Sequence, residues 1–193
     1  MHERGSGRHV AGTAQAPDQP ADWERTFRAV FDRAVAAGRA GCRTPNTMFD
    51  EADVRFLRAI GCSAQELFDF VDDFLSDGEP DFDTILAITR IRRDYFLDEM
   101  KGRPSNRVGS MDELPPKTAA VEGIEWLPRI IAKARLKLRG EMPPDLMFGC
   151  AGDRAFCRRV GMPVPQFLAL VRNSGADDSR IIRAVKESAR RQE

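Results

Sequence analysis

Histidine and paired cysteines, the residues that most often build metal and nucleophilic sites, are scarce in this chain. The histidines are His2 and His9, both near the N-terminus. A structural zinc site needs four nitrogen or sulfur ligands at close spacing, and a cysteine nucleophile needs a neighbouring base. The sequence therefore predicts no metal site and no cysteine–histidine catalysis. The four cysteines form no CxxC pair and are typical of free thiols in a reducing cytoplasm: Cys42, Cys62, Cys150 and Cys157.

The chain also lacks net charge and any long apolar run. Thirty basic residues balance thirty acidic ones, so there is no general attraction to nucleic acid or to an anionic membrane. No apolar run approaches the roughly 20 residues of a membrane helix. The first twenty residues contain no hydrophobic region typical of a secretory signal. These absences indicate a cytoplasmic protein that does not enter a membrane, and the cofactors stay unknown.

The balanced total hides opposite charges in the two halves. Residues 45–100 contain fourteen acidic and five basic residues, a net charge of −9. Residues 123–193 contain eight acidic and fourteen basic residues, a net charge of +6. Either the halves face each other and neutralise, or they form two binding faces of opposite sign.

Helical patterns fill most of the chain. Apolar residues recur at spacings of three and four from Trp23 to Val35, and again in the run that follows Pro128. Ser63 and Glu66 form a capping box at another helix start, and no alternating strand pattern exceeds a few residues. We predict an all-α fold, divided into a disordered arm at 1–21, a first helical unit at 22–100, a linker at 101–122 and a second helical unit at 123–193.

The two units resemble each other at an offset of one hundred residues. FRAVFDRAVAAGRA, from Phe27, has the same apolar spacing as LPRIIAKARLKLRG, from Leu127. At this offset the IG pair at 60–61 falls on VG at 160–161, and LFDFV at 67–71 falls on FLALV at 167–171. We predict two pseudo-repeated four-helix units packed together.

A glycine between two helices in each unit is reminiscent of a helix-turn-helix motif. In the first unit, however, the second helix contains Glu66, Asp69, Asp72 and Asp73, which phosphates would repel. We therefore expect a helical hairpin used for packing, and nucleic acid is disfavoured as a partner. A metal site on Asp69 and Asp73 is also disfavoured, because it lacks the histidines of many helical metal sites.

RIRRDYF, residues 90–96, is the densest polar cluster of the first unit. Arg92 and Arg93 are candidate ligands for an anion, and Asp94 and Tyr95 are candidates for proton transfer. The alternative is an Arg–Asp pair that closes a helix C-terminus, with Tyr95 half buried.

MFGCAGDRAF, residues 147–156, is the densest cluster of the second unit. Free amides at a helix start, with Arg154 in the first turn, can hold an anion. Asp153 is a candidate acid, but it is also expected to cap the same helix start. Arg129 and Lys133 belong to a basic stripe on the preceding helix, which is either solvated or paired with the acidic helix of the first unit.

WLPRIIAKARLKLRG, followed by DLMFGCAGDRAF, resembles an uncharacterised bacterial family of unknown function with WLPR-x-x-x-KAR and GDR signatures. The upstream LFDFVDD and RRDYF stretches are similar to longer members of that family, so the resemblance covers roughly residues 24–190. It implies a small cytoplasmic helical protein, and it brings no assigned activity, ligand or catalytic residue.

Two functions are compatible with these observations. The first is binding of an anionic small molecule, which bears a carboxylate or a phosphate, at the junction of the two units; whether the protein is also an enzyme stays open. The second is a protein–protein interaction module without a ligand pocket, with a protein partner or a second copy of the chain. The junction pocket would be lined by Arg92, Arg93, Asp94 and Tyr95 from one unit and by Arg129, Lys133, Asp153 and Arg154 from the other.

Overall fold

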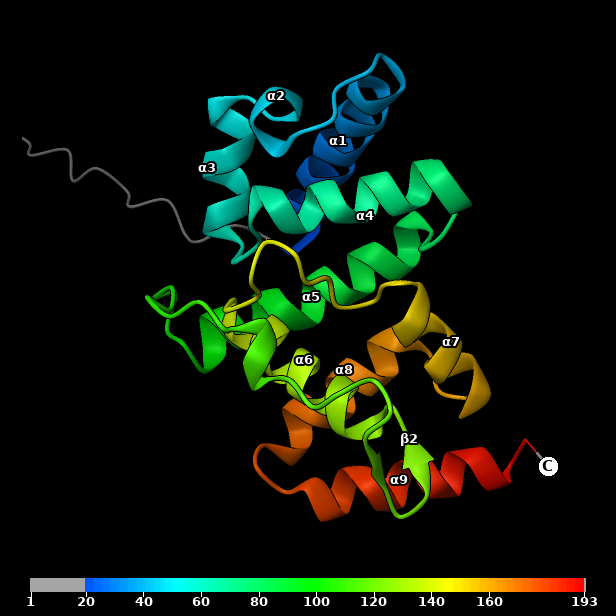
Figure 1. Ribbon diagram of the computed structural model, residues 1–193. Helices are drawn as coiled ribbons and strands as arrows, with labels where there is room; N and C mark the ends of the chain where they lie inside the picture. The colour runs from blue at the N-terminus through cyan, green and yellow to red at the C-terminus, as the bar shows by residue number, and fades with distance from the viewer. Residues whose placement is uncertain (1–19, 193) are drawn as a thin grey trace, which may run out of the picture.

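The computed structural model describes residues 20–192 and has a helical fold, as predicted (Figure 1). The predicted disordered arm lies outside these residues, except for its last two positions, which begin the first helix. The first half contains α1 (Pro20–Arg39), α2 (Pro45–Met48), α3 (Glu51–Ala59), α4 (Ala64–Asp77) and α5 (Phe82–Asp98). The second half contains α6 (Leu127–Arg139), α7 (Ala151–Arg159), α8 (Val164–Ser174) and α9 (Asp178–Arg190).

Capping residues explain where several helices begin. Ser63 accepts the Glu66 N–H and the Glu66 carboxylate accepts the Ser63 N–H, which is the capping box predicted for α4. For α5 the cap is Asp81, whose carboxylate accepts the Thr84 N–H. The helix therefore begins at Phe82.

A glycine in a left-handed conformation joins α3 to α4, and another joins α7 to α8. Gly61 has a φ of +73° and Gly161 a φ of +63°. A Cβ at Gly61 would lie 2.6 Å from Cγ of Phe96 on α5. Both the backbone conformation and the close approach of α5 therefore favour glycine at this junction. The expected packing hairpin is present in each half.

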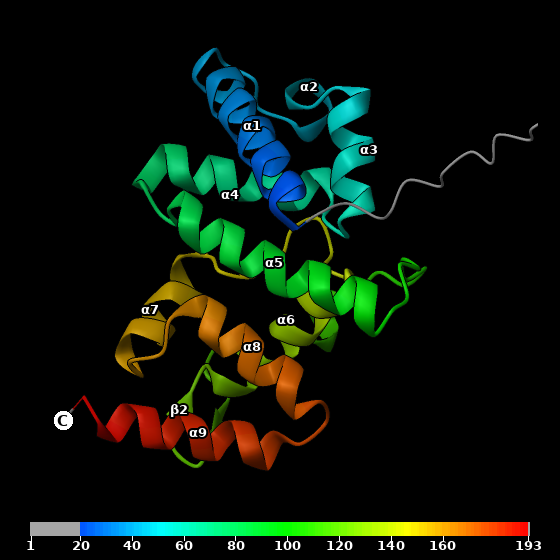
Figure 2. The same cartoon turned by 180° about the vertical axis from the view of Figure 1, so that it is seen from behind.

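One hydrophobic core extends through both halves of the molecule. It includes Phe27 and Phe70 from the first half and Leu127 and Phe167 from the second, all fully buried. In the middle of the molecule α5 packs against α6 and α8, while α1 packs against α4 (Figure 2). The junction between the halves is thus a packed interior, and cavities lie around its margin.

The predicted linker has fixed contacts and some structure of its own. It contains the 3₁₀ helix η1 (Met111–Glu113) and the strand β1 (Ala120–Val121), which pairs with β2 (Ile124–Glu125) in a small antiparallel hairpin. Leu114 packs with Leu136 and Leu146 in a second small apolar cluster. These contacts hold the segment against α6. Within residues 20–192, no helix is both long and apolar enough to cross a membrane.

Candidate functional site

Asp153 is the acceptor at the centre of a buried hydrogen-bonded group in the second half. Its Oδ2 accepts from Nζ of Lys133 at 2.5 Å and from the Gly149 N–H at 2.9 Å. Its Oδ1 accepts from Nε1 of Trp126 at 3.0 Å. Asp153 therefore does not cap α7 as predicted; the capping position is Cys150, whose side chain makes no capping bond. Asp153 is fully buried, and these three donors fix its orientation inside the second half.

Lys133 belongs to the same group and is buried with it. It lies on the face of α6 that enters the core, and its Nζ lies 3.2 Å from Sγ of Cys150. Arg129, one turn earlier, donates to the backbone carbonyl of Pro115 at 2.7 Å. The basic stripe of α6 is therefore largely buried. The expected pairing of this stripe with the acidic helix α4 is made by Lys137, which pairs with Glu66, while Arg129 and Lys133 have other partners.

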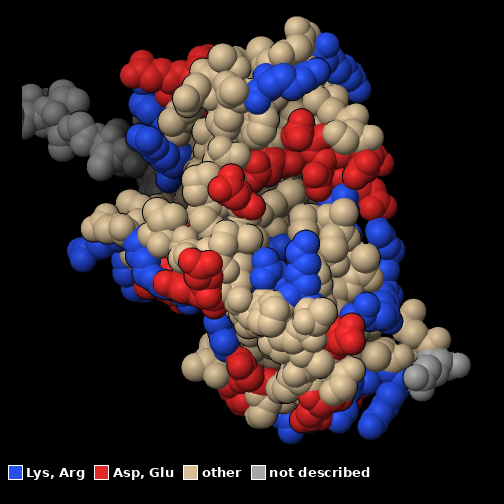
Figure 3. All heavy atoms as spheres, in the orientation of Figure 1, with Lys and Arg blue, Asp and Glu red and all other residues tan. Residues whose placement is uncertain are grey.

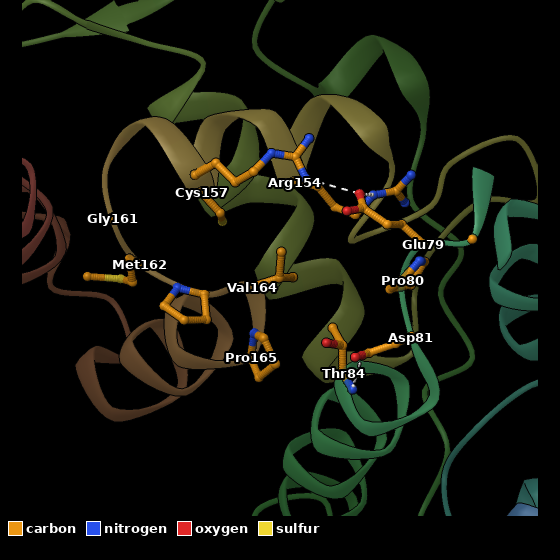
Figure 4. Close-up of a pocket in the computed structure, with 13 residues that line it drawn as sticks. Glu79, Pro80, Asp81, Thr84, Arg154, Cys157, Gly161, Met162, Val164 and Pro165 are labelled. Carbon is orange, nitrogen blue, oxygen red and sulfur yellow. Dashed lines mark hydrogen bonds and ion pairs between the residues drawn. The ribbon is translucent and has the colours of Figure 1, made fainter.

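Arg154 joins α7 to the acidic residues of the first half. Its Nη1 donates to Oδ2 of Asp73 at 2.7 Å and to the carbonyl of Gly149 at 3.0 Å, and its Nε lies 3.3 Å from Glu79. Figure 4 shows Arg154 and Glu79 directed toward each other from α7 and from the loop before α5. The acidic first half and the basic second half therefore form ion pairs here, which is one of the two arrangements that the sequence allowed. Acidic residues of the protein itself neutralise the charge of Arg154.

The RIRRDYF cluster on α5 contributes Arg93, Asp94 and Tyr95, and these side chains have other neighbours. The guanidinium of Arg93 lies 4.9 Å from the ring centre of Trp23. Asp94 lies 3.8 Å from Arg172 and 3.9 Å from Arg93. Tyr95 is half buried, as the alternative interpretation of this cluster expected, and lines a shallow cleft with Arg172.

The structure thus does not gather the eight predicted residues in one pocket of the described chain. Neighbouring residues of a helix point about 100° apart, so Arg92, Arg93 and Asp94 on α5 contact different parts of the protein. Arg129 and Lys133 line a separate cleft, and Arg154 lines a third. Two pairs of these residues meet, Lys133 with Asp153 and Arg93 with Asp94.

Arg92 has an environment unlike that of the other predicted residues. It is only 3% exposed, and its Nε has no hydrogen-bond partner. Its Nη1 contacts the sulfur of Met100 at 3.7 Å, and no carboxylate of the described residues forms an ion pair with it. A Cβ at Gly140 would overlap Nη2 of Arg92. Glycine at this position, with a φ of +67°, leaves room for the guanidinium.

Arg92 borders a cavity of about 920 Å³, which we name the Arg92 cavity. Arg55 and Arg58 of α3 also border it, and its one acidic lining residue is Glu66. Glu66 pairs with Nζ of Lys137 at 3.0 Å. Apolar side chains complete the lining: Val54, Phe96, Leu97, Pro104 and Met142.

Burial and neighbouring charges set the protonation states of the groups that line this cavity. Burial lowers the pKa of Arg92, and the nearby Glu66 opposes that change. Burial by itself would raise the pKa of Glu66, but Lys137, the Ser63 N–H and Arg92 together lower it. Burial, with a smaller contribution from Glu66, raises the pKa of Cys62 to about 12. At neutral pH the cavity therefore presents charged arginines, a charged and paired Glu66, and a neutral thiol.

Several of these residues were not singled out by the sequence patterns. Arg55 and Arg58 are three residues apart on α3, a spacing that places them on one helix face, so this signal was available. Trp126 gave no comparable signal and Glu66 was predicted only as a capping and acidic-helix residue, because their partners Asp153 and Lys137 are distant in sequence. Among the described residues, no group of three or more His, Cys, Asp or Glu side chains is arranged to hold a metal ion.

Comparison with known proteins identifies one family. No curated protein and no solved structure matches the chain. Residues 115–193, which span the hairpin and α6 to α9, match a family described as a domain of unknown function, DUF5069. Over these residues the chain is similar to a family of unknown function, as the sequence resemblance implied, and the match covers less than half of the chain.

Proposed function

We propose that the protein binds a small molecule with a carboxylate or phosphate group and an apolar body in the Arg92 cavity. The observation that carries this proposal is the buried guanidinium of Arg92, which borders the cavity without a carboxylate partner. A buried charge without a partner is costly to the folded state. An anionic ligand would supply the missing partner.

The electrostatics of the cavity favour an anion. Arg55, Arg58 and Arg92 line the cavity, and among the described residues Arg58 and Arg92 form no ion pair. Arg55 pairs with Glu51 and Glu66 pairs with Lys137, so the lining keeps a net positive charge. A guanidinium binds two oxygens of a carboxylate or phosphate at once.

The rest of the lining and the size favour a ligand with an apolar part. Side chains such as Phe96, Leu97 and Met142 would contact the body of the ligand. The volume of about 920 Å³ lies within the usual range of small-molecule sites, roughly 300–1,000 Å³. We propose binding and not catalysis at this place. The raised pKa of Cys62 keeps its thiol protonated, and the predicted catalytic residues Asp94, Tyr95 and Asp153 do not line the cavity.

Thermal denaturation with defined probes tests the proposal. We expect phenyl phosphate and decanoate to raise the melting temperature of the wild type, because each would bind the native state. Arg92→Met should abolish this shift. Arg93→Met is the matched control, because Arg93 is its neighbour on α5 but stacks on Trp23, and it should keep the shift.

An equal shift in wild type and Arg92→Met would contradict the proposal. No shift with either probe would also contradict it, and would favour the alternative of a protein–protein interaction module. Size-exclusion chromatography with light scattering would then measure whether a second copy of the chain is the partner.

We also infer that the two halves are divergent copies of one helical unit. In support, α3 and α7 begin and end one hundred residues apart, at Glu51–Ala59 and Ala151–Arg159. Arg33 pairs with Asp53, and Lys133 pairs with Asp153. Superposition of the two halves at this offset tests the inference, because copies of one unit should place their matched helices in the same arrangement, and a different arrangement would contradict it.

A further inference from the structure

A second cavity, of about 520 Å³, lies between α4 and α6 and is lined by charges of both signs. We name it the mixed-charge cleft. Figure 3 shows acidic side chains along α4 and a group of basic side chains below them on the same face. The acidic lining comes from α4 and the loop before α7, and the basic lining comes from α6 and the segment before it: Asp69, Asp72, Asp73 and Asp145, and Lys117, Arg129 and Lys133.

The acidic wall has carboxylates that the protein leaves without a cation. Asp72 and Asp73 follow Asp69 by three and four residues, so each lies about one turn of α4 from Asp69. Asp73 pairs with Arg154. Asp69 accepts a hydrogen bond from the neutral Gln65 at 2.7 Å, and Asp72 is exposed and forms no ion pair with any residue that the structure describes. On α4, Asp69 and Asp72 are therefore available to a cationic group.

The basic wall likewise has charges that no carboxylate neutralises. Lys133 is paired with Asp153 behind the cleft. Arg129 is 8% exposed, and its one hydrogen bond goes to the Pro115 carbonyl. Neither Arg129 nor the exposed Lys117 forms an ion pair within residues 20–192. The opposite charges of the two walls therefore do not join each other directly across the cleft.

The floor between the walls is held by a hydrogen bond and by close packing of one aromatic side chain. The Trp126 side chain lines the cleft, and its Nε1 is bound to Asp153. A Cβ at Gly152 would lie 2.8 Å from Cζ2 of Trp126, so the ring packs directly on the start of α7. A ligand would meet a preformed surface and would not have to order it.

We propose that the mixed-charge cleft binds a small zwitterion, with its ammonium group at Asp69 and Asp72 and its carboxylate at Arg129 and Lys117. A simple cation or anion would satisfy one wall and leave the other charged and partly desolvated, which costs free energy. A zwitterion of matching length satisfies both. This site is separate from the Arg92 cavity, because the two cavities share no lining residue.

Isothermal titration calorimetry with ω-amino acids, from glycine to 6-aminohexanoate, tests this proposal. We expect at least one member to bind, and butylamine and butyrate, which have only one charge each, to bind at least about tenfold more weakly than 4-aminobutanoate. Asp72→Asn and Arg129→Gln should each weaken the binding by about tenfold. Asp72 is exposed, so its variant is expected to fold normally.

Two controls separate the possible explanations. Asp112→Asn removes an exposed acid outside the cleft and should leave binding unchanged. Arg92→Met should also leave it unchanged, which distinguishes this site from the proposed anion site. The proposal is overturned if no ω-amino acid binds, if butyrate binds as tightly as 4-aminobutanoate, or if Asp72→Asn behaves like Asp112→Asn.

Discussion

Lys133 and Asp153 form an ion pair in the interior of the second half, with 2% and 0% of their side chains exposed. One hundred residues earlier, Arg33 and Asp53 form the corresponding pair between α1 and α3. There, however, 57% of the Arg33 side chain is exposed. The same kind of contact therefore exists in two different environments, and its contribution to stability should differ between them.

Lys133→Met is expected to destabilise the protein by about 3–5 kcal/mol, because it leaves Asp153 buried without its cation. Arg33→Met is the matched control and should cost about 1 kcal/mol, since water reaches the Arg33 side of that pair. Urea unfolding of the two variants measures the difference. Equal losses of stability would show that burial does not determine how much the Lys133–Asp153 pair contributes to the free energy of unfolding.

Arg92→Met is expected to stabilise the ligand-free protein by about 1 kcal/mol. The substitution replaces a buried cation, whose Nε has no partner, with an apolar side chain of similar length. Guanidinium chloride unfolding without added ligand measures this change. A loss of stability would mean that the contacts of Arg92 with Met100 and with the ring of Phe96 outweigh its burial.

Asp69 should make stability depend on pH. Burial raises the pKa of its carboxyl from 3.8 to about 6, against a smaller opposing effect of the Gln65 hydrogen bond. Between these values the folded state binds more protons than the unfolded state, so this group lowers stability as pH rises. At pH 7 Asp69→Asn should stabilise the protein by about 1 kcal/mol, a figure reduced for solvent screening of a partly exposed group.

The same substitution at pH 3.5 provides the control for Asp69. There the carboxyl is largely protonated in both states, so the advantage of Asp69→Asn should disappear. Urea unfolding at both pH values measures the difference. An equal effect at the two values would show that the substitution acts through packing and not through charge.

Gly61→Ala is expected to cost more than Gly161→Ala. Both glycines have positive φ, so each alanine carries a conformational cost of about 1 kcal/mol. At Gly61 the new Cβ would also press on the buried ring of Phe96, which adds about 1–3 kcal/mol of overpacking. At Gly161 it would meet the flexible side chain of Gln192, which can move aside. Melting temperatures of the two variants test the order, and equal shifts would refute it.

The helices could be predicted because their signals are local. The capping box at Ser63 and the glycine after α3 act within a few residues, and both are found where the sequence placed them. The start of α7 was misplaced for a tertiary reason. Asp153 resembles a capping residue in sequence, but it binds Lys133 and Trp126, which are distant along the chain.

The candidate site could be predicted only in part. Arg92 was named from the cluster around it, and it does border a cavity. Arg92, Arg93 and Asp94 lie on different sides of α5. The elements that pack against each side decide what each side chain contacts, and the local sequence does not show this. Arg129 and Lys133 resemble a solvated stripe, yet α6 is enclosed by the segment before it and by α5 and α8.

By itself, the amino-acid sequence determined the helical fold and the opposite charges of the two halves, because helix periodicity, capping and composition act locally or as sums. The tertiary structure decided which charges meet. Asp73 pairs with Arg154 and Glu66 pairs with Lys137, while Arg92 has no carboxylate partner among the described residues. The physical reason is that an ion pair depends on distance and burial in space, and these are set only when α4, α5, α6 and α7 pack around one core.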